Sequence, residues 1–450
     1  MITSIADDSI KKARDVAKGP HGLAYDNINI STSIFVEQTP TAMSKVQSGT
    51  FTVVYELLNA QREAMQLQPI LNDFKKSLPL KLSELRPSSS SLQAYSTQTA
   101  VNISRILFKY VKGFDDLQKH PDLQNRIRRM IPTGHKTKFY PIRASTIEEA
   151  SIEGNLNVHN DVYLVQLQRT PDELNVMAIP SFNDQLTNAH IRGAQELRQE
   201  DVNPWERREI FQLAFGSFHL VMNLIWALLE THRGTISQVG SLTHLFAILE
   251  KTRLGGEKPD YHTLLATLIQ ILDGLILNAW RNECGHDSLE KFAASKPSAQ
   301  TILGKATYIA QRYSVPDPSP HLQPVDPKAL LKELDLASSR NLRSVSPNDA
   351  TMAVNELQGS DLDSLTEQDT VYHNVVLLTR DLLYVTKVVD AMATGDWGRI
   401  EDILPSIACI FRGAGSKNYS TEILHFLFQI KKSMDARILV SFVINVLLIN

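Results

Sequence analysis

The pattern of hydrophobic and polar positions changes near residue 187. Before this point, short runs of β-branched and aromatic residues alternate with Gly, Pro and polar segments, which is typical of strands and loops. After it, apolar residues recur every three or four positions, which is typical of amphipathic helices. Strands followed by a long helical block predict an α/β core combined with a mostly helical part.

The elements expected before residue 187 are mostly short. They are a helix at 3–18, strands at 23–28, 33–37 and 50–57, a loop with broken helix at 59–85, a helix at 92–112, and strands at 162–168 and 174–182. The helices expected after it span 187–199, 220–231, 242–251, 261–282, 298–313, 372–394, 397–411 and 421–432. A fifth strand is expected just before the apolar helix at 220–231. A proline-rich segment at 315–327 and a polar break at 338–349 interrupt the helical part.

The last apolar run, 438–449, is about a dozen residues long. A membrane-spanning helix needs roughly 20 residues. We therefore expect a buried closing helix or strand and no membrane partner, with a tail anchor as the alternative.

Composition places the chain among ordinary soluble proteins. It has 450 residues, enough for two or three domain-sized units, with 43% hydrophobic and 21% charged residues. Only two cysteines, Cys284 and Cys409, are present, which argues against a disulfide framework or a cysteine-based zinc site. The polar N-terminus has no apolar targeting run, so an intracellular location is expected.

Charge is distributed unevenly along the chain. Residues 1–150 carry 20 basic and 14 acidic side chains, whereas the remaining 300 carry 26 and 35, giving a net charge of −3. The segment 126–143 contains six basic residues, no acid, and the aromatic pair Phe139 and Tyr140. Cations can neutralise phosphates while aromatic rings stack on bases. The residues expected to contact DNA are Arg126, Arg128, Arg129, Lys136 and Lys138. The alternative is a solvated loop.

Three acids stand in contexts that suit a D-D-E nuclease site. Asp26 and Asp184 each follow a short apolar strand, and Glu422 lies at a predicted helix start. Such a carboxylate set can hold two divalent metals for phosphodiester chemistry, with Mg²⁺ or Mn²⁺ as the expected cofactor. The alternatives are an Asx turn at Asp26, a helix cap at Asp184 and ordinary capping at Glu422. His219 precedes the apolar helix and is either a core histidine or part of the site.

Five stretches resemble an uncharacterised family, a domain of unknown function abundant in mushroom-forming fungi. They are 24–30, 47–51, 131–135, 181–187 and 411–422. The family's pattern is similar to that of a divergent, mobile-element-derived transposase. The run 218–224 also resembles the histidine-bearing junction of hobo/Activator/Tam-type transposases.

The resemblance implies a ribonuclease-H-like mixed sheet interrupted by a large, mostly α-helical insertion. The implied domains are a core at 1–235, the insertion at 236–400, and C-terminal helices at 401–450 that complete the core. Asp26, Asp184 and Glu422 would be the catalytic metal ligands, with His219 an auxiliary group. The expected function is metal-dependent DNA strand cleavage and transfer in the nucleus, or an inactive remnant of it, in a possible homo-oligomer. The alternative is a non-catalytic helical protein that binds a protein or nucleic acid.

Overall fold

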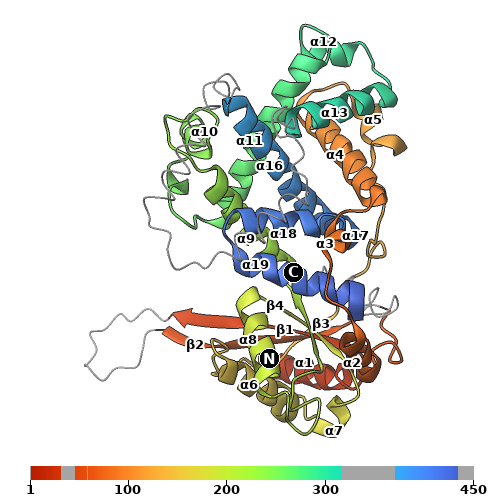
Figure 1. The fold of residues 1–450 in the computed structure, drawn as a ribbon, viewed down its shortest axis with the longest axis vertical. Helices are drawn as coiled ribbons and strands as arrows, with labels where there is room; N and C mark the ends of the chain where they lie inside the picture. Colours follow the sequence, from red (N-terminus) through yellow and green to blue (C-terminus); the bar gives the residue numbers. More distant parts are fainter. Residues whose placement is uncertain (1, 32–45, 58, 316–369, 434–450) are drawn as a thin grey trace, which may run out of the picture.

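The computed structural model describes residues 2–31, 46–57, 59–315 and 370–433. Within these ranges the fold is mixed α/β, as expected: a five-stranded sheet with its covering helices at one end, and a body of helices at the other (Figure 1). The strand expected at 33–37, nearly all of the segment 315–327, the break at 338–349 and the apolar run at 438–449 lie outside the described residues.

The sheet has the strand order β3-β2-β1-β4-β5. The strands are β1 His21–Ser31, β2 Val46–Glu56, β3 Phe139–Pro141, β4 Ile179–Asn183 and β5 Phe211–Phe215. The pairs β1–β2 and β2–β3 are antiparallel, whereas β1–β4 and β4–β5 are parallel. The expected strands at 23–28 and 174–182 are therefore neighbours in one sheet, since Leu23 pairs with Ser181.

Alternation along β1 separates its two faces. Leu23 and Tyr25 are buried, and Asp26 points to the opposite side because successive strand residues face opposite ways. The Tyr25 hydroxyl donates to Asn155 Oδ1 at 2.7 Å and lies 2.9 Å from His159 Nε2, both on α6 Ile152–Asn160. Helix α6 therefore covers the face of the sheet that lies away from Asp26.

Further short helices surround the sheet. They are α1 Ile2–Val16, α2 Leu67–Lys76, α7 Pro171–Leu174 and α8 Gln185–Leu197. Helix α3 Leu82–Leu85 lies instead against the helical body, where it lines a cavity with C-terminal residues 405–424 (Figure 1). Ser9 on α1 donates to the Pro141 carbonyl at 2.7 Å, which fixes α1 beside β3. At the opposite edge of the sheet, which is formed by β5, the Asn188 side chain of α8 donates to the Ala214 carbonyl at 3.1 Å.

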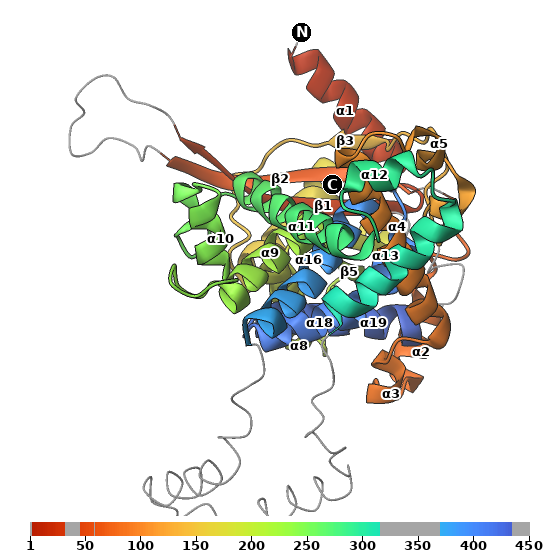
Figure 2. The ribbon, with the colours of Figure 1, turned by 90° about the horizontal axis from the view of Figure 1, so that it is seen from above.

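The helical body contains segments from distant parts of the chain. Its helices are α4 Ser89–Tyr110, α5 Asp115–Gln118, α9 Ser217–His232, α10 Leu242–Ile248, α11 Tyr261–Glu283, α12 Leu289–Ala294, α13 Ala299–Ser314, α16 Thr370–Thr394, α17 Trp397–Glu401, α18 Leu404–Gly413 and α19 Lys417–Phe428. Short 3₁₀ turns at Pro121–Leu123 and Thr252–Leu254 and a π-helix at Gln429–Ser433 complete the described elements. Helix α4 packs beside α13, as the view from above shows (Figure 2).

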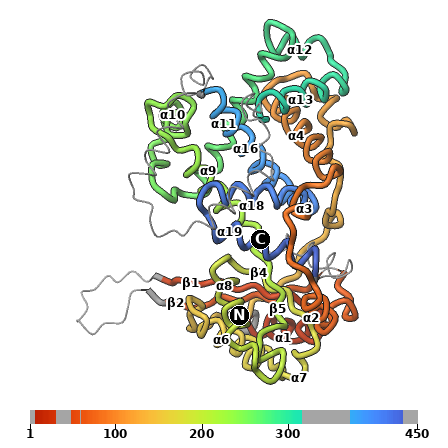
Figure 3. The backbone as a smooth tube through the Cα atoms, in the orientation of Figure 1, coloured from red at the N-terminus to blue at the C-terminus, as the bar shows by residue number. Residues whose placement is uncertain are grey.

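The chain passes between the two bodies more than once (Figure 3). It leaves the sheet after β2, contributes α4 to the helical body, and returns at β3. It leaves again after β5 and comes back toward the sheet with α19, which contacts β5 and α8. Residues within 1–235 therefore contribute to both bodies.

Several local expectations are wrong in detail. The segment expected as a strand at 162–168 is instead a π-helix, Asp161–Gln166, in which the Leu167 amide donates to the Val162 carbonyl at 2.8 Å. A short buried apolar run does not distinguish strand from helix, and here it continues directly from α6. The strand expected at 174–182 is confined to β4. The helix expected at 397–411 is divided into α17 and α18, because Pro405 lacks the amide hydrogen that a continuous helix would need.

One contiguous hydrophobic core runs from Ile10 to Ile430 through both bodies. Helix α11 is the one described helix that is long and apolar enough to cross a membrane, by length and composition alone. Half of its apolar window is buried, and it contacts α4, α13 and α16. These contacts are those of a core helix.

Candidate active site

Asp26 and Asp184 lie at the same level of two neighbouring parallel strands. Leu23 pairs with Ser181, and each aspartate comes three residues later on its own segment. Asp26 lies in the middle of β1 and Asp184 directly follows β4, so the two acids are brought together where β4 ends beside β1. A cavity of about 310 Å³ opens at this point. It is lined by Ala24, Tyr25, Asp26, Phe51, Val53, Tyr55, Phe182, Asn183, Asp184, Gly216, Phe218 and His219.

Asp26 is the more exposed of the two acids. Its Oδ1 accepts the backbone N–H of Asn27 at 2.8 Å, and its Oδ2 lies 3.8 Å from His219 Nε2. Partial burial raises the pKa of Asp26, and the charge of Asp184 adds to the rise, whereas the Asn27 amide and His219 oppose it. This hydrogen bond joins neighbours inside β1, so the expectations that Asp26 follows a strand or forms an Asx turn are both wrong. The electrostatic coupling of Asp26 to Asp184 and His219, in contrast, joins residues that are far apart in the sequence.

Asp184 has two roles available to it. Its Oδ1 accepts the Thr187 amide at 2.7 Å and so caps α8. Its charge also raises the pKa of Asp26 and of Glu149, so it is electrostatically coupled to both. The cap uses one oxygen, and Asp184 still lines the cavity.

Glu149 is the acid that sequence reasoning missed. It precedes α6, is 2% exposed, and its Oε2 has no hydrogen-bond partner within the described part of the chain. Burial raises the pKa of Glu149 to about 8, helped by the charges of Asp26 and Asp184, while hydrogen bonds from the Thr187 side chain and the Asn27 amide oppose the rise. A buried carboxyl group whose pKa is raised by both aspartates is a candidate third acid of the site.

The loop that carries Glu149 is held by close backbone contacts. The Asn155 side chain donates to the Glu149 carbonyl at 2.6 Å, and Thr50 and Ser145 form a β-bridge. A Cβ on Gly49 would stand 2.1 Å from the Ser145 carbonyl oxygen, and one on Gly154 would stand 2.0 Å from that of Glu148. Glycine is therefore required at both positions, because any side chain there would clash with these carbonyl oxygens. In the sequence, Glu149 is only one of two acids before a helix capped by Ser151, a common pattern that does not single it out.

Glu422 lies in a different environment from the one the sequence suggested. It is 2% exposed on α19, and its carboxylate accepts hydrogen bonds from Asn188 at 2.8 Å and from both terminal nitrogens of Arg192. Its charge is thus compensated inside the protein. One turn earlier on α19, burial raises the pKa of Tyr419, and the charges of Asp184 and Glu422 add to the rise.

Among the residues that the structure describes, no three His, Cys, Asp or Glu side chains stand close enough to hold one metal ion. The structure does couple Asp26, Asp184 and Glu149 electrostatically, and carboxylate oxygens suit Mg²⁺ and Mn²⁺. The unpartnered Oε2 of Glu149 fits a group that a cation would satisfy. His219 is partly exposed beside Asp26.

The basic segment is more constrained than its sequence indicated. Arg128 donates to both carboxylate oxygens of Asp402 at 2.9 Å, and Arg129 donates to Glu401 at 2.6 Å. Lys138 pairs with Glu56 at 2.9 Å on the sheet. Two further cations of the expected set, Arg126 and Lys136, have no ion pair among the described residues. DNA contact by the five residues stays a prediction. Arg126 and Lys136 suit it best, because their charges are not paired with acids of the described residues.

Comparison with known proteins gives one finding. No curated protein and no solved structure matches the chain. A family of unknown function, DUF6589, matches residues 74–450, a stretch that includes Glu149, Asp184, His219 and Glu422 but not Asp26. The match covers well over half of the chain, so the protein belongs to the family of unknown function DUF6589.

Proposed function

We propose that the chain contains a ribonuclease-H-like core that carries out divalent-metal-dependent cleavage and transfer of DNA strands, or is an inactive remnant of one. The observation that carries the proposal is the sheet: order β3-β2-β1-β4-β5, three antiparallel strands followed by two parallel ones, with Asp26 in the middle of β1 and Asp184 directly after the neighbouring β4. A ribonuclease-H-like site needs its first two acids side by side on two such strands. Strand order alone does not give function, so the proposal rests on where the acids lie.

Asp26, Asp184 and Glu149 are the residues proposed to hold the metal. A bound Mg²⁺ or Mn²⁺ would activate the attacking water or hydroxyl and neutralise charge on the phosphate. The protein's own contribution is to couple the three carboxyl groups electrostatically in a partly buried place, which raises the pKa values of Asp26 and Glu149. A cation opposes that rise. Binding of one ion by all three requires their side chains to move closer together than they stand in the described residues.

Glu149 is preferred to Glu422 as the third acid. Arg192 and Asn188 already satisfy the Glu422 carboxylate, and a metal would have to displace a guanidinium from it. Oε2 of Glu149 has no partner within the described ranges to displace. The placement of His219 near Asp26 supports an auxiliary role in orienting that carboxylate.

The test compares two aspartates that make the same local contact. Asp184 caps α8 through the Thr187 amide at 2.7 Å, and Asp260 caps α11 through the Thr263 amide at 2.8 Å. Asparagine is an equally good cap, so both Asp184→Asn and Asp260→Asn should leave the fold intact. Calorimetric titration of Mn²⁺ should show binding to wild type and Asp260→Asn, and loss of binding in Asp184→Asn.

Nicking of supercoiled DNA in Mn²⁺ gives a second readout that separates an active enzyme from a remnant. Activity in wild type and Asp260→Asn but not in Asp184→Asn supports catalysis. Metal binding without nicking supports the remnant. Equal Mn²⁺ binding by Asp184→Asn and wild type, or none by either, contradicts the metal site and favours the non-catalytic interaction protein.

A further inference from the structure

A second cavity, of about 290 Å³, lies between α4 and residues 125–128, which belong to the segment that leads from the helical body back to β3. One wall is a single face of α4, because the lining positions recur at helical spacing. The lining residues are Ser90, Gln93, Ala94, Thr97, Gln98, Val101, Asn125, Arg126, Ile127 and Arg128. None of them belongs to the cavity beside Asp26.

Gln98 lines this cavity and has a carboxamide without a hydrogen-bond partner within the described ranges. Its side chain is 2% exposed, and neither Oε1 nor Nε2 has a partner among the described residues. Both atoms are shielded from solvent, so a ligand in the cavity pairs with them once the side chain turns toward it. A buried amide left unpaired is costly, and such groups are rare in folded proteins. Asn125 adds a second open acceptor, because its Nδ2 donates to Asp390 at 3.0 Å while its Oδ1 has no partner in the part of the chain described.

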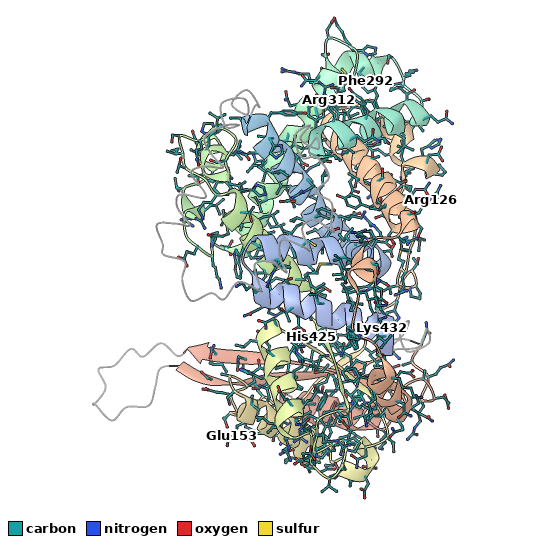
Figure 4. All side chains as sticks on the ribbon, viewed as in Figure 1. Arg126, Glu153, Phe292, Arg312, His425 and Lys432 are labelled. Carbon is teal, nitrogen blue, oxygen red and sulfur yellow. The ribbon has the colours of Figure 1, made fainter. Side chains whose placement is uncertain are left out.

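The mouth of the cavity carries positive charge. Arg126 is exposed and has no ion pair among the described residues, and it projects at the outer edge of the molecule beside α4 (Figure 4). Arg128, in contrast, is neutralised by Asp402. Ser90 brings the first turn of α4 to the same cavity, and a helix N-terminus favours an anion. The open guanidinium of Arg126 is therefore the group best placed to meet one.

We infer that this cavity binds a single adenine nucleotide. A glutamine carboxamide pairs with adenine through one donor and one acceptor, and these are the two groups of Gln98 that have no partner among the described residues. An arginine fork matches a phosphate, and Arg126 offers one at the mouth. Ala94, Val101 and Ile127 supply apolar contact for the ring. The nucleotide is either free or part of a nucleic acid strand, and the inference does not depend on the proposed metal chemistry.

The experiment uses the full chain in EDTA, with dAMP, dGMP, dCMP and dTMP as probes in calorimetry, and with single-stranded oligo-dA and oligo-dT in fluorescence anisotropy. Wild type should prefer the adenine probe by about tenfold or more in one format. Gln98→Leu should abolish the preference. It should also not destabilise the free protein, since an apolar side chain of similar shape removes two unpaired polar atoms. Arg126→Gln should weaken the binding of dAMP but leave the binding of deoxyadenosine, which has no phosphate, unchanged.

Matched controls are Gln68→Leu on α2 and Arg281→Gln on α11, which do not line the cavity and should bind as wild type does. Preference for dAMP identifies a free nucleotide as the ligand, and preference for oligo-dA without dAMP binding identifies a base within a strand. Equal binding of all probes, no binding in either format, or an unchanged preference in Gln98→Leu overturns the inference. Asp184→Asn should bind adenine normally, so failure of the metal site and failure of this site are distinguishable.

Discussion

Glu149 and Glu422 are both 2% exposed but have opposite electrostatic surroundings. Glu149 lies near two other acids and keeps an oxygen without a partner in the described residues, whereas Glu422 is paired with Arg192. Local sequence context made Asp26 and Asp184 candidates, because an acid beside a short apolar run is a recognisable pattern, although Asp26 lies within β1 and does not follow it. It could not identify Glu149, whose position depends on the bridge between Thr50 and Ser145 and not on periodicity.

Replacing each glutamate with glutamine therefore separates the two candidates for the third acid. Glu149→Gln should abolish Mn²⁺ binding in calorimetry. Glu422→Gln should retain Mn²⁺ binding but lower the free energy of unfolding by about 2 kcal/mol, because Arg192 loses its charge partner. The reverse pattern, with binding lost only in Glu422→Gln, would establish the acid that the sequence indicated.

The pH dependence of stability gives an independent check on Glu149 in the absence of metal. Its pKa is raised from 4.5 to about 8 in the folded protein, so the folded state binds an extra proton between these values. The resulting stabilisation is fully present below about pH 4.5 and is lost as the pH rises through 8, an effect on the order of 4 kcal/mol. The free energy of unfolding, measured in urea, should fall between pH 6 and 9 more for wild type than for Glu149→Gln. Parallel pH profiles for the two proteins would mean that the Glu149 pKa is close to its ordinary value.

At the scale of elements, patterning identified the elements that carry their own repeat. The long helices α4, α11, α13 and α16 and the strands β1, β4 and β5 were anticipated, because each has a clear apolar period. The three-residue β3 was missed, since it is too short to show alternation and ends in Pro141. The basic segment before it was interpreted by charge alone. Its arginines are held by acids more than 250 residues later, which no local pattern could indicate.

Asp396 is the residue that ties this basic segment to α17. It is 2% exposed, and its carboxylate accepts the backbone N–H groups of Arg128 at 2.9 Å and Arg129 at 2.7 Å. Asp396→Ala would leave both amides without an acceptor, so thermal or urea unfolding should show a loss of about 3 kcal/mol. Asp73→Ala, at an exposed position on α2, should change stability little. Equal stability of the two variants would mean that water replaces the carboxylate.

At the scale of the whole molecule, the sheet and the helical body share one core. Phe215 of β5 lies against Phe426 of α19, with ring centroids 5.1 Å apart, and against Trp397 of α17 at 6.3 Å. His425 and Lys432 mark the side of the helical body that faces the sheet (Figure 4). Helix α19 is thus the last described α-helix of the helical body, and it also packs against the sheet. Helix α19 lies in the segment 401–450 that the resemblance implied would complete the core, but its packing partner in β5 is about 200 residues earlier, a contact that periodicity cannot predict.

Shared packing predicts that the two bodies unfold together. Phe426 is 1% exposed, and Phe426→Ala should cost about 3–5 kcal/mol by leaving a cavity between Phe215 and Trp397. Hydrogen exchange should then show amides of β4 and β5 losing protection together with those of α9 and α18, because a core that spans both bodies opens as one unit. Phe139→Ala, at a 55% exposed position on β3, is the matched control and should leave protection in the helical body unchanged. Loss of protection in α18 and α19 alone would show instead that the helical body opens independently, with the sheet and its acid cluster stable without it.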